Sequence, residues 1–309
     1  MFETPVLLII YNRITETHNI FQTIHAIKPS KLYVAADGAK QEDPNDYGTC
    51  LRTRAVIMPE WPCQLKLMFK DEHLGKAQMV FQAINWFFEN EPEGIILFDD
   101  TMPHPDFFPY CEQLLDKYRD NKQIVHIGGS NFQHERQRGD ASYYFSCYAT
   151  TWGFATWKDR WENFDLSMAN LKDFNFPEIL THYMKKREER NYWLRRGIAL
   201  QRYHFDDIWE FQYKFHLWSK QGLCISPNVN LVTNVGFKKN KRKIRKMSLP
   251  AHAIMPLTHP EEIEQNRKAD RFAFRRYFNK ALRVLFAKWF TETLLGSKDK
   301  DQTAQSNDK

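Results

Sequence analysis

The stretch Gly94-Ile-Ile-Leu-Phe-Asp-Asp-Thr-Met-Pro103 places two adjacent carboxylates directly after a short apolar run. The apolar residues predict a strand that is buried on both faces of a mostly parallel sheet. Asp99 and Asp100 would then follow the carboxyl end of that strand, where open α/β sheets bind ligands. Their hard oxygen atoms suit Mg²⁺ or Mn²⁺ carrying a diphosphate. The alternative is a strand that ends in a turn with two solvated acids.

The residues before this stretch repeat the pattern of an apolar run followed by polar side chains. Pro5–Ile10 ends in Tyr11-Asn12-Arg13, and Leu32–Ala36 ends in Asp37-Gly38. Apolar residues at helical spacing lie between the two runs, and Pro29 ends that predicted helix. This is a nucleotide-binding strand–helix–strand layout, although the dinucleotide fingerprint Gly-x-Gly-x-x-Gly is absent from the sequence.

The segment His73-Leu-Gly75-Lys76 opens another predicted helix. A glycine at a helix start lets the backbone approach a ligand, and a helix N-terminus favours anions. An ordinary loop is the alternative. Further strands are predicted at residues 65–69 and 124–127, so the chain has the alternating elements of an α/β fold.

Composition narrows the class of protein. The chain has 309 residues with 42% apolar and 15% aromatic residues, enough for one large α/β domain with additions or for two domains. The sequence has no uncharged apolar run of about 18 residues and no basic segment before its first strand, so neither a transmembrane helix nor a signal peptide is predicted. An odd number of scattered cysteines indicates reduced thiols in a cytosolic protein. They are Cys50, Cys63, Cys111, Cys147 and Cys224.

Seven motifs, taken in order, resemble a bacterial subgroup of family 2-type nucleotide-diphospho-sugar glycosyltransferases with the type A fold. The resemblance fades after about His259-Pro260. The motifs are Tyr11-Asn12-Arg13, Ala35-Ala36-Asp37-Gly38, His73-Leu74-Gly75, Leu97–Pro103, Trp152–Trp157, Trp209–Gln212 and Asn230–Phe237.

The resemblance implies a donor site. Asp37 would contact the uracil or the ribose, and Asp99 would contact the ribose or the donor sugar. Asp100 would coordinate Mn²⁺ or Mg²⁺. The remaining residues implied to lie around the nucleotide are Asn12, Arg13, Gly75 and Lys76.

The resemblance also implies an acceptor and sugar cleft built from Trp152, Trp157 and Trp209. Aromatic rings suit sugars because their faces bury the apolar C–H side of a pyranose. Ordinary core packing is the alternative for these tryptophans.

A hydroxyl that displaces UDP directly needs a group that takes its proton. In enzymes of this type the group comes from the second half of the chain, which offers Asp206, Asp207 and Glu210. Glu210 is the preferred catalytic base because it stands where the subgroup commonly has Asp, and Asp207 is the second candidate. A carboxylate on a helix surface is the alternative.

Two departures from the subgroup pattern bear on the metal. Phe98 replaces the usual Glu before the paired acids, and the basic run Lys238–Lys246 replaces a usual His, with Lys243 near its expected place. Lysine and arginine can neutralise the diphosphate that a divalent cation would neutralise. We therefore expect weakened or lost metal dependence, with His259 as an alternative ligand.

The same basic run could bind anionic lipid headgroups, each charge contributing about 1 kcal/mol. It could also be a solvated loop, and nucleic acid is the least favoured partner because no known nucleic-acid module accompanies it. Apolar residues at helical spacing from Arg267 to Phe290 predict a basic amphipathic helix, which would lie on a membrane surface or pack on protein. Ser297–Lys309 is polar and is expected to be disordered.

These observations predict an α/β protein of the glycosyltransferase type A fold, with a Rossmann-like, mostly parallel sheet flanked by helices and a C-terminal helical extension. The expected parts are a catalytic domain over 1–262, the helix within 263–296 and a tail over 297–309. The expected activity is inverting transfer of a sugar, from a UDP-sugar, to a glycan or lipid-linked acceptor in surface polysaccharide (capsule or lipopolysaccharide) biosynthesis. A non-catalytic sugar-nucleotide- or glycan-binding protein is the alternative. The expected location is the cytoplasm or the inner face of the cytoplasmic membrane, and the oligomeric state is left open.

Overall fold

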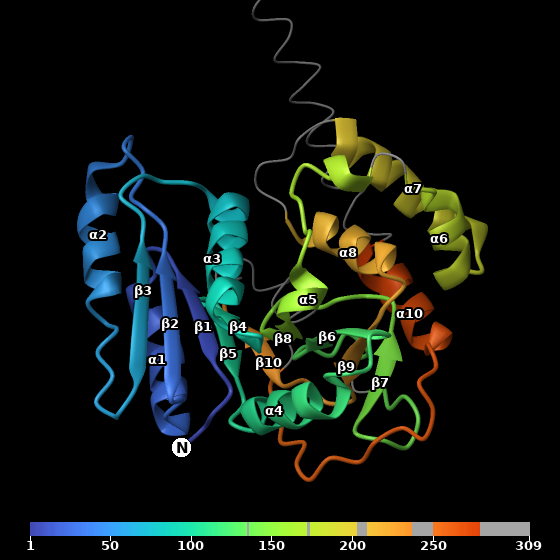
Figure 1. Ribbon diagram of the computed structural model, residues 1–309, viewed down its shortest axis with the longest axis horizontal. Coiled ribbons are helices and arrows are strands. Elements are labelled where there is room, and N and C mark those ends of the chain that lie inside the picture. The colour runs from blue at the N-terminus through green and yellow to red at the C-terminus, as the bar shows by residue number, and fades with distance from the viewer. Residues whose placement is uncertain (135, 172–173, 203–208, 237–249, 279–309) are drawn as a thin grey trace, which may run out of the picture. The chain divides into compact units, whose positions relative to one another are not determined.

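The computed structural model describes residues 1–134, 136–171, 174–202, 209–236 and 250–278 (Figure 1). Contacts divide the chain into two units, Met1–Asn266 and Arg267–Lys309. Within the second unit, helix α10 (Arg267–Ala273) continues into a π-helical turn, Phe274–Phe278. The rest of the predicted C-terminal helix and the tail lie outside the described residues. Within the described part of the chain, no helix is long and apolar enough to cross a membrane.

An eight-stranded sheet with the order β3-β2-β1-β4-β8-β6-β9-β7 forms the centre of the first unit. The first four strands in that order are parallel, as expected of buried apolar runs. The predicted mostly parallel α/β architecture is therefore confirmed. The strands are β1 (Val6–Ile10), β2 (Lys31–Ala36), β3 (Gln64–Phe69), β4 (Glu93–Phe98), β6 (Ile124–Gly128), β7 (Tyr143–Ser146), β8 (Phe154–Trp157) and β9 (Leu223–Pro227).

Strand β8 reverses the direction of the sheet because it runs antiparallel to both β4 and β6. In its register Phe154 pairs with Ile96 and Trp157 pairs with Glu93. The N-terminal end of β8 therefore lies beside the carboxyl end of β4. The sequence did not predict this strand, since Gly153 and the threonines beside it obscure the alternation that marks strands.

A second, two-stranded sheet joins distant parts of the chain. Its strands are β5 (Thr101–Pro103) and β10 (Val232–Asn234), which pair in antiparallel fashion with Asn234 opposite Thr101. This pairing brings Gly236 against Asp100, and a Cβ atom at Gly236 would lie 2.5 Å from a carboxylate oxygen of Asp100.

Helices cover both faces of the large sheet (Figure 1). One face packs against α1 (Ile14–Ile27) and α4 (Phe107–Tyr118), and the other packs against α3 (Lys76–Asn90) and α8 (Glu210–Ser219). Alternate residues of β1 serve the two faces, as the period of a strand requires. The remaining helices are α2 (Pro44–Arg54), α5 (Lys158–Trp161), the 3₁₀ turn Ala169–Leu171, α6 (Phe176–Tyr183) and α7 (Arg187–Arg202).

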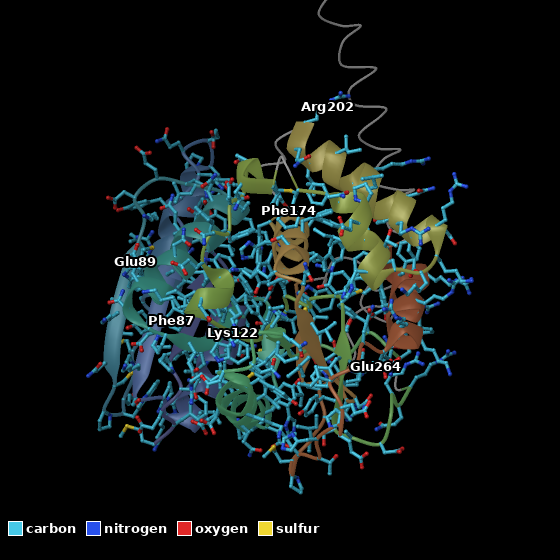
Figure 2. All side chains as sticks on the ribbon, turned by 45° about the vertical axis from the view of Figure 1, so that its right-hand side comes forward. Phe87, Glu89, Lys122, Phe174, Arg202 and Glu264 are labelled. Atoms are coloured by element: carbon cyan, nitrogen blue, oxygen red, sulfur yellow. The ribbon has the colours of Figure 1, made fainter. Side chains whose placement is uncertain are left out.

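Helix α3 illustrates how the sequence fixes this packing. Its apolar residues recur at helical spacing and are buried, and Phe87 is fully buried with its ring edge-on to Tyr33 of β2 at 5.0 Å. Gly94 leaves the space that this ring fills, since a Cβ atom there would lie 2.4 Å from it. Glu89, two residues further along the helix, is exposed (Figure 2).

The variant Phe87→Ala should lower the free energy of unfolding by about 3–5 kcal/mol because it leaves a cavity between helix and sheet. Glu89→Ala, on the exposed side of the same helix, should change it by no more than about 0.5 kcal/mol. Urea denaturation followed by circular dichroism measures both. Equal effects of the two substitutions would contradict the packing described for α3.

Candidate functional site

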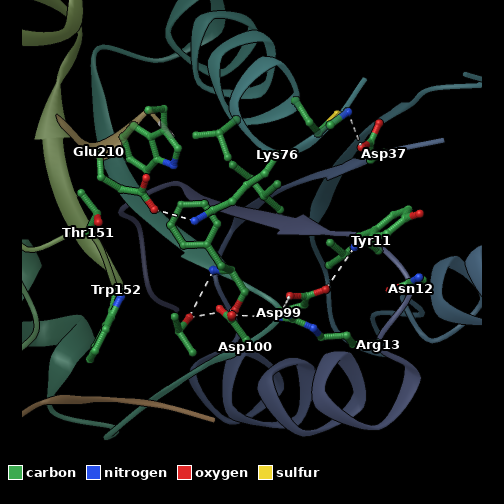
Figure 3. A pocket seen from close by; sticks show the side chains of 18 of the residues that line it. Tyr11, Asn12, Arg13, Asp37, Lys76, Asp99, Asp100, Thr151, Trp152 and Glu210 are labelled. Atoms are coloured by element: carbon green, nitrogen blue, oxygen red, sulfur yellow. Dashed lines mark hydrogen bonds and ion pairs between the residues drawn. The ribbon is translucent and has the colours of Figure 1, made fainter. Parts of the chain in front are cut away.

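A cavity of about 450 Å³ opens at the carboxyl ends of β1, β2 and β4, and residues from all three strand ends line it (Figure 3). Most of the residues singled out in the sequence also line it. They are Asn12, Arg13, Asp37, Gly75, Lys76, Asp99, Asp100, Trp152, Trp209 and Glu210.

Arg13 bridges the two adjacent acids on one side of the cavity. Its Nη1 atom lies 3.0 Å from Asp99 Oδ1 and 2.8 Å from Asp100 Oδ2. The second oxygen of Asp99 accepts a hydrogen bond from the backbone N–H of Tyr11 at 3.1 Å. Burial raises the pKa of Asp99 to about 6, although the Arg13 guanidinium acts in the opposite direction. The bridge ties the end of β1 to the end of β4.

Asp37, at the end of β2, holds the loop that leads into α3. Its carboxylate accepts hydrogen bonds from the backbone N–H groups of Gly38 (2.9 Å), Leu74 (2.8 Å) and Gly75 (3.1 Å). His73 Nδ1 lies 2.9 Å from Asp37 Oδ2. A carboxylate offers about four acceptor positions, so these partners occupy the group. Asp37 lines the cavity as expected, but its oxygens are engaged by protein.

Asp46 of α2 is a site residue that the sequence did not reveal. It accepts hydrogen bonds from the Tyr11 hydroxyl, from Asn12 Nδ2 at 2.6 Å and from the Lys40 N–H at 2.8 Å. Burial by itself would raise the pKa of Asp46. The hydrogen bonds from Tyr11 and Asn12 outweigh burial and hold this pKa below its ordinary value. Asp46 therefore fixes the cavity wall that Asn12 belongs to. The sequence around Asp46 has little apolar patterning, so it did not indicate that this carboxylate is buried beside the cavity.

Lys76 and Glu210 meet from two helix starts. They are the first residues of α3 and α8, and Lys76 Nζ lies 2.5 Å from Glu210 Oε1 (Figure 3). Gly75 precedes α3 with a φ of 80°, a backbone conformation that glycine adopts readily. Both helix N-termini favour negative charge nearby. Because of this ion pair, the charge of Glu210, the candidate base, is neutralised by Lys76, which also lines the cavity.

Aromatic rings form another wall. The ring of Phe98 lies 6.2 Å from the ring of Trp209, measured between centroids, and both residues line the cavity. Trp209 is 1% exposed, and its indole N–H has no hydrogen-bond acceptor among the described residues. Trp152 is partly buried and lies edge-on to Phe132 at 5.3 Å. Trp152 is thus placed where a sugar ring could contact it, whereas Trp209 lies within the wall and supports Phe98 from behind.

Two predicted site residues lie elsewhere. Trp157 is buried in the core, with Arg160 stacked on it at 4.3 Å, because antiparallel β8 carries it to the opposite end of β4 from Asp99. His259 lies at a different cavity and its Nδ1 is 2.9 Å from the hydroxyl of Tyr143. The expected acceptor role of Trp157 and the expected metal-ligand role of His259 are therefore wrong. Asp207 and Lys243 lie outside the described residues.

The acids at the cavity do not form a protein cage for a metal. No group of three or more His, Cys, Asp and Glu side chains suited to a metal occurs within the described ranges. Asp100, the expected ligand, is paired with Arg13, so a cation bound there would meet the guanidinium charge. Mg²⁺ can bind through a single carboxylate and substrate phosphates, but these residues do not supply a fuller set.

Comparisons with known proteins give distant structural likenesses. No protein family matches the sequence, and neither does any curated protein. A mannosyltransferase from Pyrobaculum calidifontis, solved with GDP-Man and Mn²⁺, is 13% identical, with 72% of this chain and 70% of that chain covered and a TM-score of 0.37. Mouse xyloside xylosyltransferase 1 is 10% identical, with 70% and 81% covered and a TM-score of 0.33. HddC from Yersinia pseudotuberculosis is 9% identical, with 50% and 77% covered and a TM-score of 0.31. Scores this low establish neither a family nor an activity.

The raised pKa of Asp99 predicts a pH-dependent contribution to stability. Its folded-state pKa of about 6 exceeds the ordinary value of 3.8, so the folded protein binds the proton more tightly. Relative to Asp99→Asn, the wild type should lose up to about 3 kcal/mol of unfolding free energy as the pH rises from about 4 to about 7. Urea denaturation at the two pH values measures this. If the unfolding free energy of the wild type minus that of Asp99→Asn stayed constant or rose with pH, the assignment would be contradicted.

Proposed function

We propose that this chain is a glycosyltransferase of the type A fold that moves a sugar from a nucleotide-diphosphate donor, a UDP-sugar, to a glycan or lipid-linked acceptor. The observation that supports it best is one cavity combining three groups of residues. These are cations for a diphosphate, aromatic rings for a sugar, and the carboxylate of Glu210. The sheet order, with antiparallel β8 next to β4, is consistent with this reading.

The donor's diphosphate would lie between Arg13, Lys76 and the N-terminus of α3. Arg13 keeps 42% of its side chain exposed and Lys76 keeps 57%, so both can contact a ligand while paired. A helix N-terminus and cationic side chains both stabilise phosphate charge. Asp37 would act by anchoring the loop before α3, and Asp46 by fixing Asn12 beside the nucleotide.

Glu210 would take the proton of the acceptor hydroxyl. The hydroxyl oxygen forms a bond to the anomeric carbon, the bond from that carbon to the diphosphate oxygen breaks, and its electron pair leaves with UDP. The proton passes to Glu210, and attack from the face opposite UDP inverts the anomeric centre. A diphosphate that attracts Lys76 would loosen its ion pair with Glu210 and so free the base when the donor is bound.

The positive charge that stabilises the diphosphate leaving group would come from the protein's own side chains. Arg13 already occupies the acids at which a cation is expected. The basic run Lys238–Lys246 begins two residues after Gly236, which lies against Asp100. Asp100 would hold a divalent cation together with donor phosphates if one binds. We propose that such a cation is dispensable.

We place the reaction in surface polysaccharide assembly, in the cytoplasm or at the inner membrane face. The pairing of Glu210 with Lys76 also favours a second candidate, a sugar-nucleotide-binding protein without transferase activity, because a neutralised carboxylate is a poor base. UDP release separates the two candidates.

The variant Glu210→Gln should lower kcat by about 100-fold or more, since it removes the proton acceptor. UDP release from a panel of UDP-glucose, UDP-galactose and UDP-N-acetylglucosamine, with UDP affinity measured by calorimetry, reports both steps. Lys76→Met is the matched variant at the other end of the ion pair and should weaken UDP binding. Transfer by Glu210→Gln near the wild-type rate would remove Glu210 from this role.

Treatment with EDTA should leave most of the UDP release intact, because Arg13 and the lysines supply the positive charge. The same assay after dialysis against EDTA, with and without added Mn²⁺, measures this. Arg13→Met should then lose activity that Mn²⁺ partly restores, since Asp100 becomes free to bind it. Complete loss of wild-type activity with EDTA, recovered by Mn²⁺, would refute the metal-independent reading.

A further inference from the structure

Helix α7 and the two residues before it concentrate positive charge. Between Lys185 and Arg202 the sequence has seven lysines and arginines against two glutamates, a net charge of +5, whereas the whole chain carries +6. In the sequence this segment is separate from the basic run Lys238–Lys246 and from residues 267–309.

The charges gather on one side of the helix. Arg187, Arg195, Ile198 and Arg202 are exposed and fall within an arc of about 80° along about 22 Å of helix. Ile198 is an exposed large apolar side chain, 50% exposed, in the middle of this row. The opposite side of the helix is buried, with Trp193 fully so. We call the outer row, together with Lys186, the α7 face.

The cations of the α7 face outnumber the exposed acids of the same helix. Glu188 is exposed and lies about 20° beyond Arg195 around the helix, so the surroundings of the face hold four cations against one acid. Lys186, Arg187, Arg195 and Arg202 form no ion pair with a described residue. Arg196 behaves differently because it is buried on the inner side, where its guanidinium lies over Phe211 of α8 at 4.1 Å. The helix thus uses one arginine for packing and presents the others outward.

A second exposed apolar residue lies near the C-terminal end of the row. Phe174 is 36% exposed, and its N–H donates to the Leu171 carbonyl, which also accepts a hydrogen bond from Gln201 of α7. A row of cations with apolar side chains beside it fits a surface that is both anionic and able to admit apolar groups. Nucleic acid supplies the anions, but a phosphate backbone gives an exposed isoleucine little to pack against.

We propose that the α7 face binds an anionic phospholipid surface. Lipid phosphates neutralise the cations, and Ile198 enters the headgroup layer. The inner side of α7 packs on α8 through Arg196 and Phe211, and Phe211 is the residue after Glu210. The proposed lipid contact is therefore made by the helix that packs against the one carrying the candidate base. This inference depends only on the charge and exposure of α7, and it stands whether or not the chain transfers a sugar.

Sedimentation of the full-length protein with vesicles tests it. Vesicles of phosphatidylglycerol and phosphatidylcholine in equal amounts are compared with vesicles of phosphatidylcholine alone. The triple variant Lys186→Glu, Arg187→Glu, Arg195→Glu reverses three charges of the face. A matched control, Lys28→Glu, Arg52→Glu, Lys117→Glu, reverses three exposed charges on α2, on α4 and just after α1.

We expect the wild type and the control to bind the anionic vesicles and the α7 variant to bind at least tenfold more weakly, with little binding to neutral vesicles. The single variant Ile198→Ser should bind the anionic vesicles more weakly than the wild type, although its net charge is the same. Equal binding by the two triple variants, equal binding to both vesicle types, or no wild-type binding would overturn the proposal. Complete displacement of the protein from vesicles by an equal phosphate concentration of polyuridylate would also overturn it, because the face would then prefer nucleic acid.

Discussion

The ion pair that Arg13 makes with Asp99 and Asp100 holds the cavity together. Two adjacent carboxylates at the end of a buried strand repel each other and lose hydration, and a single guanidinium lies within 3.0 Å of both. Because Arg13 follows β1 and the acids follow β4, the bridge also fixes how the two strand ends approach. The remaining positioning contacts, Asp37 to the loop before α3 and Asp46 to Asn12, extend outward from this bridge along the same edge of the sheet.

Much of this edge could be predicted from the sequence, for a physical reason. Buried parallel strands appear as continuous apolar runs, so Val6–Ile10 and the run before Asp99 were recognisable, and the polar residues that follow them had to share one edge. Trp157 was misplaced because local pattern does not show strand direction, and only the antiparallel pairing of β8 puts it at the far end. Asp46 was missed because its partners are distant in sequence, and its own helix has little apolar patterning.

Two acids also took roles that residue type alone does not decide. Asp37 was expected to face the nucleotide, yet three backbone N–H groups occupy its oxygens. Glu210 reaches the cavity, yet it does so already paired with Lys76. Both residues line the cavity, but the groups that pair with them come from other parts of the fold and could not be inferred from residue type. Phe98 is a further example, because its ring contacts that of Trp209 at the N-terminal end of α8 and the two form part of a hydrophobic wall.

The contact between Trp161 and Trp209 has a consequence for how this chain can change. Their ring centroids lie 6.4 Å apart, so two residues that are 48 positions apart in the sequence lie side by side in the core. Because these two positions adjoin, a change of length in an exposed part of the segment between them need not move the strands that hold its ends. The buried side of the segment, where Trp193 packs on Phe211 of α8, is not free to change in this way. Descendants of this chain could therefore acquire new exposed surfaces while the cavity at the ends of β1, β2 and β4 stays unchanged.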